Sequence, residues 1–90
     1  MENVDKRVLK VLKIINSIGN FENSNNFLVD GLVDSLDIIR LITLLETEFE
    51  ISINALDIVP ENFDSIKNIT KLIKQKIAIK QIYKWYHLTN

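Results

Sequence analysis

Ninety residues can build one small domain with a single hydrophobic core, but they are too few to enclose a deep substrate cleft between two lobes, so an enzyme is not expected. Hydrophobic residues make up 47% of the chain and charged residues 26%, a balance that excludes a disordered protein. The formal net charge is -1 and cysteine is absent, so disulfides and thiolate zinc sites are excluded and any thiol chemistry must come from a cofactor.

The sequence also predicts neither a membrane span nor a signal peptide. No apolar run approaches the roughly 18 residues that a membrane span needs. Residues 1–5 have neither the positive charge nor the apolar run of a signal peptide. Together with the absence of cysteine, these features predict a cytoplasmic protein without stable membrane insertion.

The charges are distributed unevenly along the chain. Residues 31–65 hold eight acidic side chains against Arg40 alone, a local charge of -7, whereas residues 66–90 hold six lysines and no acid. An acidic middle suits a basic protein partner, and a basic C-terminal part suits an acidic partner, nucleic acid or anionic lipid. Ordinary solvated helix faces would give the same pattern.

The N-terminal part predicts a helix followed by a long loop. Apolar residues at three- and four-residue steps predict an amphipathic helix over residues 3–18 that ends at Gly19. The residues of this stripe are Val4, Val8, Val11, Leu12, Ile15 and Ile18. Residues 20–34 are rich in Asn, Ser, Asp and Gly, which predicts an ordered loop that scattered apolar residues pin to the core. These apolar residues are Phe21, Phe27, Leu28, Leu32 and Val33.

The segment from Ser35 to Glu50 has the clearest two-sided helical pattern. Its predicted core stripe consists of Ile38, Leu41, Ile42, Leu45 and Phe49. Its outward arc consists of Ser35, Leu36, Ile39, Arg40, Thr43, Glu46 and Thr47. Leu36 and Ile39 are thus apolar residues on the outward side, where an isolated domain has little reason to place both. Partial burial under the preceding loop is the alternative.

The C-terminal part predicts a short helix and a long one. Residues 54–59 fit one short turn of helix before Pro60 interrupts it, and a last helix begins near Asp64 or Ser65, either of which can cap it. Its core stripe consists of Ile66, Ile69, Leu72, Ile73 and Ile77. Beyond Ile77 the apolar residues scatter around the helical wheel while lysines continue. The prediction is an all-α bundle of three main helices and one short helix.

Ser35 is the candidate for chemistry because a loop delivers it to the start of the strongest helix. A serine at this position is most often an N-cap. If Asp34 takes the capping role instead, the Ser35 hydroxyl lies at the surface near unpaired amides and the positive end of the helix dipole. A phosphate-bearing serine is physically reasonable in that setting, although this reasoning alone does not identify the modification.

The helix and its flanks resemble the acyl carrier protein family. Residues 34–41 read DSLDIIRL and residues 45–49 read LETEF, which is similar to the second helix of that family. Residues 61–66 read ENFDSI, which is similar to the start of its last helix. The resemblance covers residues 3–77. Asp-Ser-Leu is a short pattern by itself, but its position among helices of the right length makes it specific.

The resemblance implies a small four-helix bundle without catalytic activity or a resident metal. A phosphopantetheinyl transferase would use coenzyme A and magnesium to attach 4'-phosphopantetheine to Ser35, with Asp34 orienting the serine and aiding transferase recognition. The arm's thiol would hold an acyl or aminoacyl group as a thioester, loaded by a ligase and passed to a transferase or synthase. Residues predicted to contact these partners are Leu36, Asp37, Ile39, Arg40 and Glu46. The carrier domain is predicted as residues 1–77, with residues 78–90 as a basic, aromatic extension that continues the last helix.

The chain departs from the carriers of fatty acid synthesis. Arg40 and Thr47 occupy outward positions where those carriers tend to have acids, so the partner enzymes are expected to differ. The approach DGLVDS resembles stand-alone carriers, such as the D-alanyl carrier of teichoic acid modification, and differs from the Gly-Gly-His-Ser of peptide synthetase modules. We therefore expect a dedicated, monomeric carrier.

Other readings of the same residues are weaker. Asp30, Asp34 and Asp37 cluster, but they lack the glycine and closing glutamate of a calcium loop. Nucleophilic catalysis by Ser35 would need a base, and the single histidine, His87, is expected to be an exposed tail residue. A carrier-like interaction domain that is never modified is a further alternative, against which the intact Asp-Ser-Leu argues.

The main alternative is a non-catalytic binding module that contacts nucleic acid or an anionic membrane through the Lys-rich C-terminal helix. Its candidate residues are Lys67, Lys71, Lys74, Lys76, Lys80, Lys84, Tyr83, Trp85 and Tyr86. A solvated helix face with the aromatic residues packed on the domain explains the same pattern and is preferred here. A carrier alone should show no salt-sensitive binding to nucleic acid or vesicles.

Overall fold

The computed structural model describes residues 3–89, with side chains up to Tyr86, so the prediction for His87 lies outside the described side chains. The elements in chain order are α1 (Val4–Ile15), η1 (Phe21–Asn23), α2 (Ser35–Phe49), η2 (Ala55–Asp57), η3 (Pro60–Asn62) and α3 (Ile66–Thr89), where η denotes a single 3-10 turn. Over residues 3–89 there is no β-strand. The predicted all-α fold is therefore confirmed.

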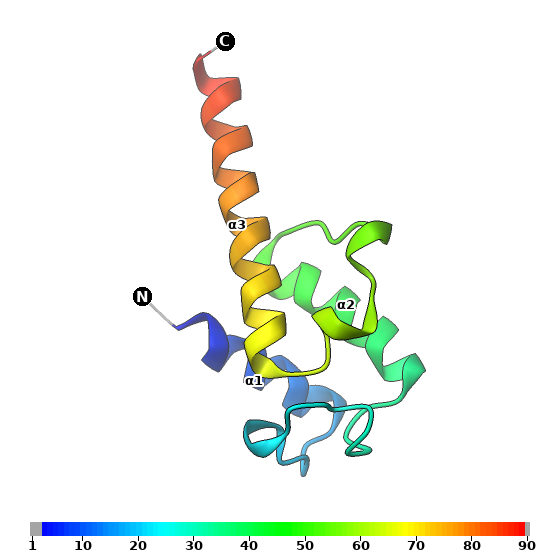
Figure 1. Ribbon diagram of the computed structural model, residues 1–90. Coiled ribbons are helices and arrows are strands. Elements are labelled where there is room, and N and C mark those ends of the chain that lie inside the picture. The colour runs from blue at the N-terminus through cyan, green and yellow to red at the C-terminus, as the bar shows by residue number, and fades with distance from the viewer. Residues whose placement is uncertain (1–2, 90) are drawn as a thin grey trace.

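The three α-helices pack around one core, with α2 and the first half of α3 both lying against α1 (Figure 1). The core contains the apolar stripes predicted for the three helices, joined by residues from the long loop and from the segment between α2 and α3. The fully buried large side chains are Val8, Leu12, Phe21, Phe27, Leu41, Leu45, Phe63, Ile69 and Ile73. Ile38, placed in the predicted stripe of α2, is half-buried at its edge.

Helix α1 ends three residues earlier than predicted. The backbone leaves the helix at Asn16 (φ -146°), whose N–H still donates to Leu12 O at 3.0 Å. The Asn16 side chain reaches across to Leu32 O, with Nδ2 at 3.1 Å. The chain then turns outward, so Ile18 is 91% exposed and its placement in the core stripe was wrong.

The long loop before α2 is ordered and anchored by two phenylalanines, as predicted. Phe21 and Phe27 meet edge to face, with ring centroids 5.1 Å apart and an interplanar angle of 85°. The Phe27 N–H donates to Asp64 O at 2.8 Å, and Phe27 O accepts from the Leu32 N–H at 2.9 Å. The loop is thus tied to the start of α3 at the same point where it turns back toward α2.

The predicted short turn of helix is present as the 3-10 turn η2, and a second 3-10 turn, η3, follows it from Pro60. Asn54 caps η2 with its side chain, and Pro60 occupies the first position of η3, where its missing N–H costs nothing. Asp57 in η2 forms an ion pair with Lys76 of α3. This ion pair ties the segment to the bundle although no large side chain of η2 is buried.

Helix α3 starts after Ser65, whose Oγ accepts from the Asn68 N–H at 3.1 Å. It continues without a break to Thr89 and projects well beyond the other helices (Figure 1). Tyr83, Trp85 and Tyr86 are all exposed on this projection. The expectation that the aromatic residues pack on the domain was therefore wrong, because all three keep more than half of their surface exposed.

Candidate functional site: the start of helix α2

A reciprocal pair of hydrogen bonds fixes the start of α2. Asp34 Oδ1 accepts from the Asp37 N–H at 2.8 Å, and Asp37 Oδ2 accepts from the Asp34 N–H at 3.0 Å. This is a capping box, which satisfies two backbone donors at the helix start at once. Asp34 therefore takes the capping role, as the sequence allowed, and Ser35 becomes the first residue of the helix.

Ser35 is exposed, and its hydroxyl makes no hydrogen bond within the described part of the chain. The first amides of an α-helix have no intrahelical partner, and the cap uses that of Asp37, so those of Ser35 and Leu36 face solvent. Together with the positive end of the helix dipole, they favour an anionic group on the serine oxygen. The site fits a phosphodiester attached to the Ser35 oxygen.

The loop that leads to Ser35 holds the serine in one place. Gly31 has φ +72°, a left-handed conformation that side chains other than glycine rarely adopt. The Ser24 hydroxyl donates to Asp30 Oδ2, which closes the turn just before it. Val33 is buried in the core two residues before Ser35. The position of the serine is thus set by its neighbours, while its own side chain stays unengaged.

The outward face of α2 carries the two apolar residues that the helical wheel placed there. Leu36 is 72% exposed and Ile39 is 62% exposed, so neither is covered by the preceding loop. Arg40 lies beside them, with its guanidinium 3.8 Å from Asp37 Oδ1. This face, defined by Leu36, Ile39 and Arg40, combines apolar surface with charge next to the serine.

Two residues of the predicted partner face also have roles inside the domain. Asp37 is half of the capping box, a role that the spacing of Asp34 and Asp37 would have indicated. Glu46 is half-buried rather than fully outward, and its Oε2 accepts from the Ile53 N–H at 3.0 Å. Glu46 therefore holds the segment after α2, and its contact with partners stays a prediction.

The comparisons with known proteins agree with this geometry. The family model described as the phosphopantetheine attachment site matches residues 5–73. An acyl carrier protein from Buchnera aphidicola subsp. Schizaphis graminum is 38% identical over 78 residues, covering 79% of this chain and 99% of the relative. An aminoacyl carrier protein 2 from Bradyrhizobium diazoefficiens is 31% identical over 79 residues, covering 84% of this chain and 89% of the relative. No solved structure gives a match of comparable strength.

The chain therefore belongs to the acyl carrier protein family. Its family confirms the resemblance seen in residues 34–66, the carrier class of function, the use of covalent 4'-phosphopantetheine and the absence of catalytic activity. Within residues 3–89, no helix is long and apolar enough to cross a membrane, and no cluster of His, Asp or Glu is arranged to hold a metal ion.

Proposed function

We propose that Ser35 carries the 4'-phosphopantetheine arm. Its hydroxyl oxygen would attack the phosphorus of coenzyme A that bears the pantetheine, forming a phosphodiester, while the bond from that phosphorus to the bridging oxygen breaks and the nucleotide bisphosphate leaves with this oxygen. A magnesium-dependent transferase would supply the catalysis, and the serine proton would pass to its base. The arm's thiol would then hold an acyl or aminoacyl group as a thioester for presentation to partner enzymes.

The observation that carries this proposal is that Asp34, and not Ser35, caps the helix. The aspartate caps the helix, with Oδ1 at 2.8 Å from the Asp37 N–H, so the serine hydroxyl is exposed and without an internal partner. A serine that served as the cap would have its oxygen engaged by the first turn. The arrangement supports a serine kept for modification, with Asp34 orienting it for the transferase.

We propose the surface around the serine as the docking site for partner enzymes. Leu36 and Ile39 would enter apolar hollows on the partner, while Asp37 and Glu46 would face basic groups. Arg40 replaces an acid that carriers of fatty acid synthesis tend to have there, so it would select a partner with a complementary acid. This supports a dedicated carrier, and the similarity to an aminoacyl carrier protein makes an aminoacyl group one candidate cargo.

The remaining proposals concern the organisation of the chain. We propose residues 1–77 as the carrier domain and residues 78–90 as an extension with a separate role. The family match ends at residue 73, just before this boundary. The carrier would act as a cytoplasmic monomer, because partner enzymes must reach Ser35 from solution.

Intact-protein mass spectrometry tests the proposal. The purified chain is incubated with coenzyme A, magnesium and a broad-specificity phosphopantetheinyl transferase. The expected result is a gain of one phosphopantetheine. With acyl-coenzyme A as the donor, the whole acylated arm is expected on the protein, and neutral hydroxylamine should release the acyl group because thioesters react with it.

Two serine variants give the control for this experiment. Ser35→Ala is expected to abolish the mass gain, whereas Ser52→Ala, which removes another exposed serine after α2, should load like the wild type. Loading that persists in Ser35→Ala would disprove the assignment of the arm to this residue. An unloaded wild-type chain under conditions that load another carrier would remove the carrier proposal for this transferase class.

A further inference from the structure

Helix α3 carries two rows of residues, and after Ile77 one row changes from apolar to basic while the other changes from basic to apolar. One row faces the core, and the other lies about a third of a turn away on the outer surface. The core row runs through Ile66, Ile69, Ile73 and Ile77 and then through Lys80 and Lys84. The outer row runs through Lys67, Lys71 and Lys74 and then through Ala78, Ile82 and Trp85. The apolar side of the helix therefore moves to the outer row where α3 leaves the bundle.

The projecting part of α3 is thus amphipathic, although its apolar residues do not continue the core stripe. Ile82 is 67% exposed and Trp85 is 65% exposed, and Ile79 and Tyr86 flank them on the same side. At about 100 degrees per residue, these side chains occupy less than half of the helix circumference. The prediction that they scatter around the wheel was wrong. These residues lie off the core stripe, but they share one side of the helix.

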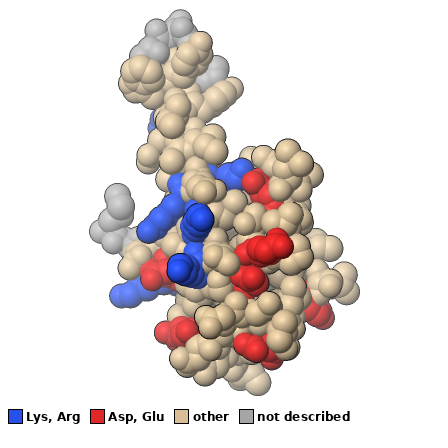
Figure 2. All heavy atoms as spheres, viewed as in Figure 1, with Lys and Arg blue, Asp and Glu red and all other residues tan. Residues whose placement is uncertain are grey.

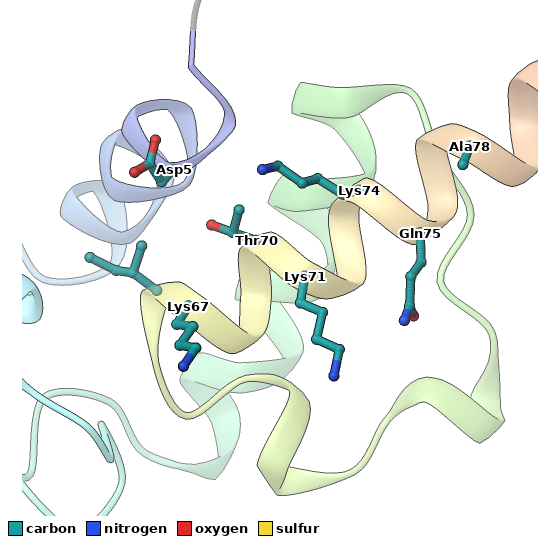
Figure 3. A pocket seen from close by; sticks show the side chains of 8 residues that line it. Asp5, Lys67, Thr70, Lys71, Lys74, Gln75 and Ala78 are labelled. Carbon is teal, nitrogen blue, oxygen red and sulfur yellow. The ribbon is translucent and has the colours of Figure 1, made fainter.

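The outer row borders two shallow grooves that meet at Ala78. The first, of about 810 Å³, lies between the start of α1 and α3, and the stems of Lys67, Lys71 and Lys74 line it (Figure 3). The second, of about 310 Å³, is lined by Ala78, Ile82 and Trp85 with Gln81. One flank of α3 is therefore basic beside the bundle and apolar along the projection.

The charge that α3 contributes to this flank has one sign, although Asp5 of α1 also lines the first groove. Helix α3 contains six lysines and no acidic residue, and Figure 2 shows basic side chains gathered along it while acidic ones lie over the rest of the bundle. Lys80 Nζ donates to Glu50 O at 2.6 Å, and Lys76 forms an ion pair with Asp57. Lys67, Lys71 and Lys74 are exposed on the outer row. This row therefore complements an anionic surface.

We propose that this flank of α3 binds an anionic lipid surface. An amphipathic helix with aromatic and aliphatic residues on one face and lysines elsewhere lies in the plane of a membrane interface. Trp and Tyr suit the headgroup level because their rings are amphipathic. The apolar projection would enter the headgroup region, and the outer-row lysines would lie over the lipid phosphates. This is a surface association and not a membrane span.

The association leaves the carrier site accessible. Helix α2 begins at the end of the bundle remote from the tip of α3 (Figure 1), and the molecule extends 48 Å along its longest axis. Ser35 would therefore lie far from the part of α3 that enters the headgroup region. The inference is independent of the proposed function, because it predicts the same lipid binding for Ser35→Ala.

Trp85 provides the test, because it is the single tryptophan of the chain and lies in the proposed contact. The full chain is mixed with vesicles of phosphatidylcholine containing phosphatidylglycerol, and with vesicles of phosphatidylcholine alone. We expect a blue shift of Trp85 emission and co-sedimentation with the anionic vesicles. Both should weaken as salt rises, because the lysine contribution is screened.

Matched variants locate the contact on α3. Ile82→Gln should weaken binding, whereas Ile18→Gln, which changes an even more exposed isoleucine outside α3, should not. Lys71→Gln combined with Lys74→Gln should weaken binding by at least about tenfold, because each lysine near an anionic surface contributes to attraction. Glutamine keeps the helix in each case.

Three results would overturn the inference. The first is the absence of an emission shift and of co-sedimentation with anionic vesicles at low salt. The second is salt-sensitive binding of a short RNA or DNA duplex in place of vesicles, which would make the flank a nucleic-acid surface. The third is an emission shift that follows protein concentration without lipid, which would show that a second copy of the chain covers the flank.

Discussion

The two halves of helix α3 are built from the same residue types and behave in opposite ways. Between Ile66 and Ile77 the isoleucines are turned toward α1 and α2, and the exposed lysines lie outside. Between Ala78 and Tyr86 the isoleucines and aromatic residues are exposed, and Lys80 and Lys84 lie in the row that faced the core. We refer to these as the packed half and the projecting half.

This difference shows that the side of the helix on which the apolar residues lie, more than the composition of each half, decides what that half does. A helix buries an apolar stripe only where another element covers that side. In the packed half, the stripe meets the core formed by α1, α2 and the loop. In the projecting half, the end of α2 is approached by Lys80, which donates to Glu50 O at 2.6 Å, and the apolar residues have moved to the other row. An apolar face kept out of the core is available for binding.

The largest expected effect is on the free energy of unfolding, to which the packed half should contribute far more than the projecting half. Ile73→Ala in the packed half should lower the free energy of unfolding by about 2–5 kcal/mol, because Ile73 is fully buried and its loss leaves a cavity. Ile82→Ala in the projecting half should change it by less than about 0.5 kcal/mol. Urea unfolding followed by far-ultraviolet circular dichroism measures both. Equal losses in the two variants would contradict the division.

A smaller effect is expected at the start of α2. Asp34→Ala should lower the free energy of unfolding by about 0.5–2 kcal/mol, because the helix loses its cap. Asp34→Asn should retain most of it, since an amide oxygen can accept the same bond. Thermal unfolding of the pair, with the loading rate of Ser35 measured alongside, distinguishes loss of the cap from loss of transferase recognition. An alanine variant as stable as the wild type would show that the cap is dispensable.

The smallest effect is acid-dependent and confined to the packed half. The hydrogen bond from Lys76 holds the pKa of Asp57 below its usual value of about 3.9, against an opposing effect of burial. Because the pKa is lower in the folded state, the stabilisation is present above the unfolded value and is lost as pH falls through the folded one. Asp57→Asn should therefore lose stability at neutral pH and depend less on pH under acid conditions.

The projecting half provides the control for this prediction. Residues 78–86 contain no acidic side chain, so none of their own groups titrates in the range where Asp57 does. The free energy of unfolding of wild type and Asp57→Asn is measured at a series of pH values from neutral to acid. Two curves that stay parallel below the usual aspartate pKa would show that the ion pair with Lys76 contributes nothing.

The sequence predicted the elements whose evidence is local. The stripe of α2 follows from residue spacing and is present in the structure. The cap was left open by the sequence, because Asp and Ser both suit that position, and the structure gives the role to Asp34. The exposure of Leu36 and Ile39 likewise follows from helix geometry alone.

Features that depend on tertiary contacts were not predictable in this way. Helix α1 ends at Ile15 because the Asn16 side chain binds Leu32 O, a residue far along the chain. The aromatic residues of α3 were expected on the domain because the length of the helix beyond the core was unknown. Glu46 was placed outward by the wheel, but its long side chain reaches back to the Ile53 N–H.

Mapping the modified residue tests the central claim most directly. After loading with phosphopantetheine, the wild-type chain is cut with trypsin, which releases residues 14–40 as one peptide containing Ser17, Ser24 and Ser35. Fragmentation of this peptide in the mass spectrometer shows which serine carries the arm. The account predicts the arm on Ser35 alone. An arm on Ser17 or Ser24, or on a peptide outside residues 14–40, would contradict it.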